Sequence, residues 1–209
     1  MPLRRPLAVT LGVLALGFFG GCGDSRTPAP KLSRIEPPNG FKAVVDIDLI
    51  GSFHAARAAF PQLKETKGSI VFVSAGQAYS PHALQAHVGA AKAGVDMLMK
   101  DLALDWGKYG IRSNSVVPGP IDDTEGMRRL APLAGSKEQF MKAVPLGRLG
   151  HVDDIGAVAV FLASPLASYV TGTVLVADGG MNLLGSGIWL SVAMGGGQAV
   201  KTAERMERT

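Results

Sequence analysis

Three short β-branched segments, separated by helical stretches, constrain the fold of this chain more than any other feature. They are residues 69–74 (Ser-Ile-Val-Phe-Val-Ser), 111–117 and 172–178. Short runs rich in valine and isoleucine are typical of strands that are buried in a parallel sheet. Parallel neighbours need a crossover connection, and a helix usually supplies it. The alternation therefore predicts an α/β fold with a doubly wound parallel sheet.

The predicted helices lie before, between and after these strands. Residues 41–63 carry apolar side chains at helical spacing, and Pro38-Asn39-Gly40 precedes them as a helix start. Residues 84–108 form a long alanine-rich stretch, and residues 153–163 predict a third helix. Two weaker helical stretches are 124–133 and 136–144.

Composition excludes several classes of protein. The single cysteine excludes an internal disulfide framework and any CxxC metal or redox site, and we expect no bound metal. The net charge of +4 comes mostly from residues 1–40, which carry five Lys or Arg against two acids. The remaining residues carry sixteen against fifteen, so their surface is nearly neutral. We therefore expect no nucleic-acid partner.

Residues 1–22 have the layout of a targeting segment. Arg4 and Arg5 precede an apolar run from Leu7 to Phe19, and Gly20-Gly21-Cys22 follows. This pattern is typical of a secretory signal peptide, and small residues before a cysteine resemble a bacterial lipoprotein site where Cys22 is lipidated. Two alternatives stay open, a simple membrane anchor and an upstream stretch outside the working protein. Residues 23–38 contain four prolines and predict an extended linker, and residues 181–209 predict a flexible tail.

A series of landmarks from residue 40 to residue 180 resembles the C-terminal two-thirds of the short-chain dehydrogenase/reductase family. The resemblance implies a Rossmann-like sheet that is truncated at its N-terminal half, within a domain of residues 39–180. The landmarks occur in the family's order, as follows: Asp-Ile-Asp-Leu-Ile-Gly (46–51), Ile-Val-Phe-Val-Ser (70–74), Ala-Ala-Lys-Ala-Gly-Val (90–95), Ile-Arg-Ser-Asn-Ser-Val-Val-Pro-Gly-Pro (111–120), Phe-Leu-Ala-Ser-Pro-Leu-Ala-Ser-Tyr-Val-Thr-Gly (161–172) and Asp-Gly-Gly (178–180).

Departures from the family pattern are similar to 2,4-dienoyl-CoA reductases, especially the peroxisomal type. Asp48 stands where most members carry asparagine, and the segments 83–87 and 118–130 match that subfamily. Val88 stands where the catalytic tyrosine belongs, and Ala75 stands where the serine belongs, next to Ser74. The resemblance implies that NADPH delivers a hydride to an unsaturated fatty acyl-CoA. It also implies that Lys92 and Asp48 arrange a water molecule as the proton source.

The resemblance assigns further residues to cofactor and substrate. It implies cofactor contacts for Lys92, Pro118, Gly119, Ile121 and Thr124, and substrate contacts for Arg129, His87, Gln85 and Asn39. For each of these residues, an ordinary structural role stays open as an alternative. Asp48 and Lys92 can be solvated helix residues, the Pro-Gly turn can simply end a strand, Arg129 can be a surface charge, and His87 and Gln85 can make ordinary polar contacts.

Residues 1–40 do not resemble the first half of the family's domain. That half supplies the glycine-rich turn that cradles a pyrophosphate at a helix N-terminus, and no such turn stands in these residues. We therefore expect a reductase by descent that is inactive as this chain alone. The alternatives are a non-catalytic interaction module and an exported lipoprotein with a vestigial reductase fold. The resemblance implies a homo-oligomer through residues 41–63 and 84–108, and a cytoplasmic location that conflicts with the export implied by the leader.

Overall fold

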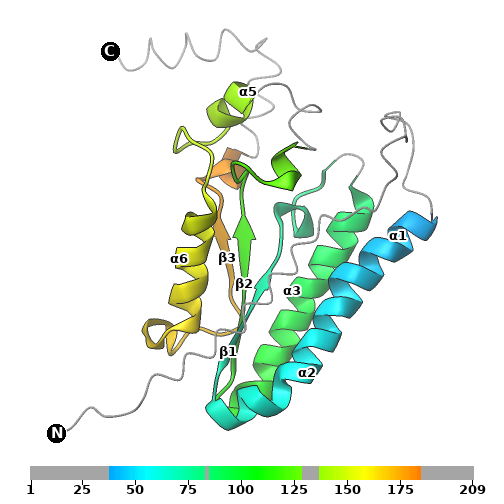
Figure 1. Ribbon diagram of the computed structural model, residues 1–209, viewed down its shortest axis with the longest axis vertical. Helices are drawn as coiled ribbons and strands as arrows, with labels where there is room; N and C mark the ends of the chain where they lie inside the picture. The colour runs from blue at the N-terminus through cyan, green and yellow to red at the C-terminus, as the bar shows by residue number, and fades with distance from the viewer. Residues whose placement is uncertain (1–37, 83–84, 129–136, 185–209) are drawn as a thin grey trace, which may run out of the picture.

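The computed structural model describes residues 38–82, 85–128 and 137–184. Its elements alternate in the order that the sequence predicts, and Figure 1 shows their arrangement. They are α1 (Pro38–Val44), the π-helical turn η1 (Val45–Ile50), α2 (Gly51–Thr66), β1 (Ser69–Val73), the 3₁₀ turn η2 (Gly76–Ala78), α3 (Ala86–Trp106), η3 (Gly107–Tyr109), β2 (Arg112–Pro118), α5 (Lys137–Lys142), α6 (Val152–Ala163), η4 (Pro165–Ala167), β3 (Val174–Ala177) and η5 (Met181–Leu184).

The three described strands form a parallel sheet in the order β1-β2-β3, which confirms the predicted α/β class. Ile70 of β1 lies opposite Ser113 of β2, and Val116 of β2 lies opposite Leu175 of β3. The strand β2 is the central one, and five consecutive residues of it are buried. Its position between two parallel neighbours buries the polar residues Ser113, Asn114 and Ser115 together with Val116 and Val117.

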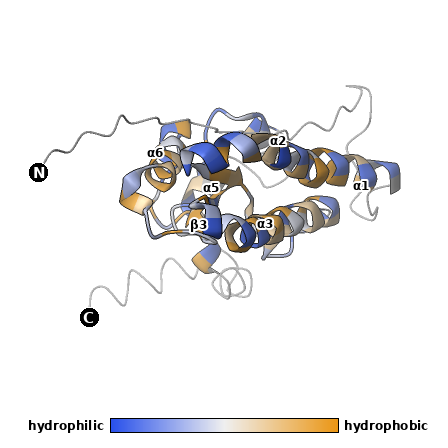
Figure 2. Ribbon diagram, turned by 90° about the horizontal axis from the view of Figure 1, so that it is seen from below, coloured by the Kyte–Doolittle hydropathy of each residue, from blue (hydrophilic) through white to orange (hydrophobic). Residues whose placement is uncertain are grey.

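Helices cover both faces of this sheet. On one face, Ile70 and Phe72 of β1 pack with residues of α2 and α3, among them Leu63 and Met99. On the other face, Val71 and Val116 pack against Leu162 of α6. Because successive side chains of a strand point to opposite faces, the single apolar run of β1 serves both layers. Figure 1 shows α6 on one side of the strands and α2 with α3 on the other, and Figure 2 shows hydrophobic and hydrophilic residues alternating around these helices.

The helix predicted over residues 41–63 is present but is not one regular α-helix. It begins at Pro38, as the Pro-Asn-Gly start predicts, and it continues to Thr66. Its middle, Val45–Ile50, is π-helical. A π-helical turn inserts one extra residue into the helix and re-aims the side chains around it, and such turns are frequent at functional sites.

A capping interaction fixes the start of α6. Arg148 donates to both carboxylate oxygens of Asp154 at 2.7 and 2.9 Å, and the backbone N–H of His151 donates to the same carboxylate at 2.7 Å. The hydrogen bond from Arg148, with that from His151, holds the pKa of Asp154 well below its ordinary value. The carboxylate is thus the form that the folded chain favours.

Asp154→Asn is therefore expected to lower the melting temperature of the full chain at neutral pH. At acidic pH the same substitution should lower the melting temperature by less. A carboxyl group with a depressed folded-state pKa contributes stability above its ordinary value of 3.8 and loses that contribution as pH falls through the lowered value. Melting curves of both proteins over this acid range measure the effect. A difference that stays constant down to the lowest pH would contradict the assignment. Because the group is exposed, added salt should shrink the difference as well.

Three predicted regions, the leader, the linker and the tail, fall partly or wholly outside the described residues. The leader 1–22 with Cys22, and nearly all of the linker 23–38, lie there. Of the predicted tail, residues 181–184 are described and form the 3₁₀ turn η5. Within the part of the chain that the structure describes, none of the helices has the length and apolarity to cross a membrane.

Candidate functional site

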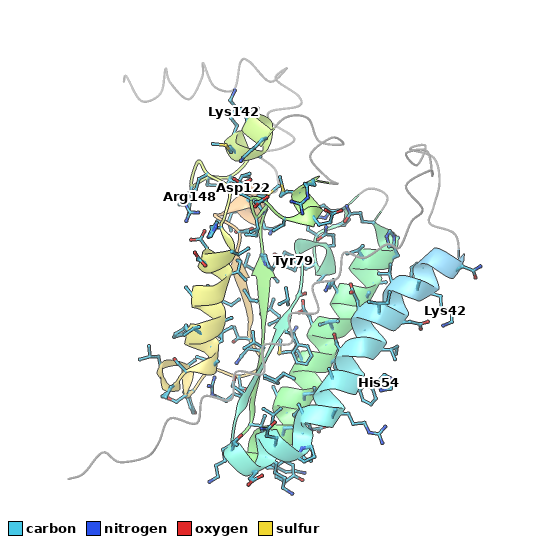
Figure 3. All side chains as sticks on the ribbon, viewed as in Figure 1. Lys42, His54, Tyr79, Asp122, Lys142 and Arg148 are labelled. Carbon is cyan, nitrogen blue, oxygen red and sulfur yellow. The ribbon has the colours of Figure 1, made fainter. Side chains whose placement is uncertain are left out.

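The candidate site lies where the strands end and α3 begins. The strands β1 and β2 are followed by loops at their carboxyl ends, and ligands of open α/β sheets bind at this edge. Figure 3 shows Tyr79 and Asp122, which follow β1 and β2, at this end of the molecule. Lys42 and His54 point outward from α1 and α2, away from this edge.

Lys92 and Asp48 form a buried ion pair at this edge. The Nζ atom of Lys92 lies 3.4 Å from Oδ2 of Asp48, and the two side chains are only 7% and 8% exposed. The same Nζ atom donates to the carbonyl oxygen of Val73 at 3.2 Å. Neither residue is therefore the solvated surface charge that the sequence had left open. A buried pair of this kind is costly to desolvate, which favours a functional reason for it.

Local packing brings the two residues together. Asp48 lies on the π-helical turn η1, and Lys92 lies on α3, which packs against that turn. The Leu49 side chain of η1 packs against Gly94 of α3, where a Cβ atom would come within 2.7 Å of Leu49 Cδ2. The sequence pointed to Lys92 and Asp48, but not to this contact between their two elements.

The pair leaves donor capacity for a ligand. An ammonium group has three N–H donors, and Val73 and Asp48 engage two of them. The remaining N–H has the chemistry to donate to a hydroxyl group or a water molecule. With Asp48 as an acceptor beside it, the arrangement can orient a small hydroxylic molecule and stabilise charge that develops on it.

Polar atoms without a partner lie near the pair. Ser74 Oγ and His87 Nδ1 are buried and accept or donate no hydrogen bond within the described residues. Ser74 follows Val73 directly, and His87 lies in the first turn of α3. Buried polar atoms usually have a partner, and because Asp96 Oδ1 and Ser115 Oγ also lack one, the missing hydrogen bonds indicate a ligand position only together with the neighbouring ion pair.

The positions of the family's tyrosine and serine carry no catalytic group in the structure. Val88 is half-buried on α3, four residues before Lys92, and its side chain has no acidic proton. Ala75 is buried and follows Ser74. Position 88 therefore offers no phenol for proton transfer, and the buried ion pair one turn further along α3 is that of Lys92 with Asp48.

The other predicted substrate residues take different places. Gln85 accepts a hydrogen bond from Gln77 at 2.7 Å, which ties the start of α3 to η2. Asn39 is exposed in the first turn of α1. Arg129 lies outside the described residues. Only His87 and Gln85 are thus seen at the start of the helix that carries Lys92.

The predicted cofactor loop follows β2. Gly119 donates its N–H to Ala177 at 3.1 Å, and Ile121 bridges to Gly150. The hydroxyl of Thr124 donates to the carbonyl of Ile121 at 2.8 Å and accepts from the N–H of Met127 at 3.3 Å. Thr124 thus caps the helical turn that follows. The loop is held rigidly at the carboxyl end of the central strand.

A buried carboxylate that the sequence did not single out braces this edge. Asp178 accepts the N–H of Gly180 at 2.8 Å, the N–H of Asn182 at 2.8 Å and the Asn182 side-chain amide at 2.6 Å. We call these contacts the Asp178 clip. The clip touches both site loops, because a Cβ on Gly119 would lie 2.6 Å from Asp178 Cα and one on Gly76 would lie 3.3 Å from Asn182 Oδ1.

Tyr79 stands at the same edge as a further polar group. Partial burial, with the charges of Asp178 and Asp96, raises its pKa above the ordinary value of 10.0. The phenol therefore stays protonated at physiological pH and is a hydrogen-bond donor. In residues 38–82, 85–128 and 137–184, no group of three or more His, Cys, Asp or Glu side chains is arranged to hold a metal ion.

Comparison with known proteins gives this geometry a context. The family model described as Enoyl-(Acyl carrier protein) reductase matches residues 28–182. The chain is 56% identical over 149 residues to the peroxisomal 2,4-dienoyl-CoA reductase [(3E)-enoyl-CoA-producing] of Saccharomyces cerevisiae, covering 71% of this chain and 51% of that protein. It is 43% identical over 190 residues to the enzyme of the same description from Pongo abelii, covering 86% of this chain and 64% of that protein.

The solved structures support the same comparison. The gluconate 5-dehydrogenase from Burkholderia cenocepacia J2315, solved in complex with NADP and tartrate, matches with a TM-score of 0.66 and 31% identity. The match covers 75% of this chain and 60% of that one. The chain therefore spans between about half and two thirds of the length of the proteins it matches.

Proposed function

Because this chain belongs to the short-chain dehydrogenase/reductase family and is closely related to 2,4-dienoyl-CoA reductases, we propose that it is the proton-delivering part of such a reductase. The proposed reaction adds one hydride and one proton across a conjugated 2,4-dienoyl thioester. The complete reaction also needs a segment that holds the dinucleotide phosphates, and we propose that this chain does not reduce the substrate alone.

The buried pair of Lys92 and Asp48 is the observation that carries this proposal. Addition of a hydride to a conjugated thioester leaves a dienolate, which must be protonated on carbon. A hydroxylic proton donor must then be held in place and made more acidic. The ammonium group of Lys92, 3.4 Å from the Asp48 carboxylate, suits a water molecule that gives its proton to that carbon. Reducing a simple ketone instead requires a proton on oxygen, for which the family's tyrosine is absent here.

The residues present fit the nicotinamide end of a dinucleotide cofactor. NADPH, when bound, supplies the hydride. Lys92 would hold the nicotinamide ribose, and Pro118, Gly119, Ile121 and Thr124 would border the ring and the nearest phosphate. The unpartnered Ser74 Oγ and the glycine at position 119, which keeps the loop tight against Asp178, support this placement. In the described residues, no glycine-rich turn after a strand is available for the pyrophosphate.

For the substrate we propose a fatty acyl-CoA, as the names of the relatives indicate. His87 and Gln85, at the start of α3, are proposed to face the thioester end, Asn39 to contact it from α1, and Arg129 to meet the CoA phosphates. Apolar side chains on η1, α2 and α3 that are between 42% and 82% exposed support a homo-oligomer through residues 41–63 and 84–108. They are Ile47, Ile50, Phe53, Met97 and Leu104.

The test compares the chain alone with a completed protein. The completed protein, which we call the chimera, joins residues 39–209 behind the part of the S. cerevisiae relative that precedes the region matched here. We expect the 209-residue chain to show no NADPH-dependent reduction of a 2,4-dienoyl-CoA, and the chimera to consume NADPH only when the dienoyl-CoA is present. Absorbance of NADPH at its long-wavelength band follows both reactions.

Two results would contradict the proposal. Turnover by the purified chain alone would show that the cofactor needs no additional segment. A folded chimera that binds NADPH without reducing the dienoyl-CoA would show that the proposed reductase activity is wrong. Fluorescence of bound NADPH separates failure of cofactor binding from failure of the chemistry.

A further inference from the structure

The side chain of Asn182, on the turn η5 that follows β3, stands between two segments of the candidate site. Its Nδ2 atom donates to Oδ2 of Asp178 at 2.6 Å, and the backbone N–H of Asn182 donates to the same oxygen at 2.8 Å. The amide also packs against Gly76 of η2, where a Cβ atom would lie 3.3 Å from Oδ1 and 3.4 Å from Nδ2. Asp178 therefore fixes the position of the amide, and the amide limits how far η2 can approach.

The distance to Asn182 is what favours a glycine at position 76. Gly76 is not one of the glycines with a positive φ, so its backbone conformation does not itself require a glycine. A Cβ atom at 3.3 Å from Oδ1 is closer than ordinary van der Waals contact, so a side chain here must displace the amide or the turn. The two residues are thus coupled by direct packing.

The turn η2 passes this contact on to the start of α3. Gln77, the residue after Gly76, donates from Nε2 to Oε1 of Gln85 at 2.7 Å. The carbonyl oxygen of Gln77 also packs against α3, where a Cβ on Gly89 would lie 3.1 Å from it. The first turn of α3 carries His87. Displacement of η2 therefore moves the two residues that are proposed to face the thioester, Gln85 and His87.

The other end of the Asp178 clip serves the loop after β2. A Cβ on Gly119 would lie 2.6 Å from Asp178 Cα, so this loop rests on the backbone of Asp178 and not on the amide of Asn182. If the amide is removed, Asp178 keeps the backbone N–H groups of Gly180 and Asn182 as donors. The contact with η2 can thus be weakened while the proposed cofactor loop keeps its support.

We propose that Asn182 is a positioning residue for the substrate side of the site. It sets the place of η2 relative to the loop after β2, and through η2 it sets the places of Gln85 and His87. The proposal rests on the proposed function, which assigns those two side chains to the thioester end of the substrate. Asn182 acts through η2 and not on the reacting atoms.

Kinetics of the chimera separate this role from a general effect on stability. Asn182→Ala should raise KM for the dienoyl-CoA by at least about fivefold and leave the dissociation constant of NADPH within about twofold, because η2 is loosened and the loop after β2 is not. Leu183→Ala removes an 87% exposed side chain from the same turn and should leave both values within about twofold. An unchanged KM, or an equal loss for substrate and cofactor together with a lower melting temperature, would overturn the proposal.

A compensating substitution tests the packing against Gly76. Gly76→Ala alone should raise KM for the dienoyl-CoA, because its methyl group pushes against the amide of Asn182. In the double variant Gly76→Ala with Asn182→Ala, the methyl group takes up space that the amide leaves. The double variant should therefore have a lower KM than either single variant. Losses that simply add would contradict the coupling.

Hydrogen exchange in the 209-residue chain tests the positioning of η2 without any catalytic assay. The N–H groups of Tyr79 and Ser80 donate to the carbonyl of Gly76 at 3.2 and 2.9 Å. In Asn182→Ala these amides should exchange at least about fivefold faster than in the parent chain, and in Leu183→Ala at the parent rate. Unchanged exchange in Asn182→Ala would overturn the proposal. Faster exchange, with a chimera that reduces no dienoyl-CoA, supports the positioning of η2 and shows that the proposed function alone is wrong.

Discussion

Replacement of Lys92 by alanine in the chimera is expected to lower the rate of dienoyl-CoA reduction below about one tenth, a loss of more than about 1.4 kcal/mol of transition-state stabilisation. The reason is that Nζ is the cationic group of the site, held by Val73 and Asp48 and available to a ligand with its remaining donor. Initial rates at saturating NADPH and dienoyl-CoA measure the effect. Lys100→Ala, an exposed lysine two turns further along α3, should leave the rate unchanged.

The same substitution also affects stability, and the two effects can be separated. Removal of Lys92 leaves the buried Asp48 carboxylate without its counter-charge, which is expected to cost about 3–5 kcal/mol of unfolding free energy. The double variant Lys92→Met with Asp48→Asn removes both charges, so it should recover most of this stability without recovering activity. If the double variant, or Lys92→Ala itself at a temperature where it is folded, keeps more than about a tenth of the rate, the assigned role of Lys92 is wrong.

The second large effect is expected at Gly119. A Cβ atom at this position would lie 2.6 Å from the Cα and 2.7 Å from the Cβ of Asp178, closer than real side chains approach. Gly119→Ala must therefore displace backbone at the end of β2 or at the Asp178 clip, with an expected cost of about 1–3 kcal/mol. Because the loop after β2 borders the proposed cofactor site, NADPH affinity in the chimera should fall as well. Chemical denaturation and NADPH titration measure the two effects.

Gly156 offers the control for this substitution. It lies within α6, and a Cβ there would have no atom within 4 Å. Gly156→Ala should thus raise stability by up to about 1 kcal/mol through helix propensity alone. If Gly119→Ala is as harmless as Gly156→Ala, the close contact with Asp178 does not hold the loop.

Most of the fold follows from local sequence patterns. The runs with valine and isoleucine predicted β1, β2 and β3 within one or two residues, because such residues favour strands of a parallel sheet. The parallel direction of the strands was predicted from the helices between them, because parallel neighbours need such crossover connections. The π-helical turn Val45–Ile50 could not be predicted, since one inserted residue hardly changes an apolar pattern in which most positions are already hydrophobic.

The candidate site was predictable only in part. Lys92 and Asp48 were identified through the resemblance to the family, and the structure brings them together. The Asp178 clip was missed because Asn182, which supplies two of its three hydrogen bonds, belongs to a segment that the sequence placed in a tail.

The substrate preference of the chimera tests the account most directly. With NADPH as the hydride source, the account predicts reduction of a 2,4-dienoyl-CoA and no measurable reduction of a simple ketone, since Lys92 and Asp48 serve protonation at carbon and Val88 replaces the tyrosine that would protonate an oxygen. Comparison of kcat/KM for the two substrates in one preparation gives the answer. A chimera that reduces the ketone at least as efficiently as the dienoyl-CoA would contradict it.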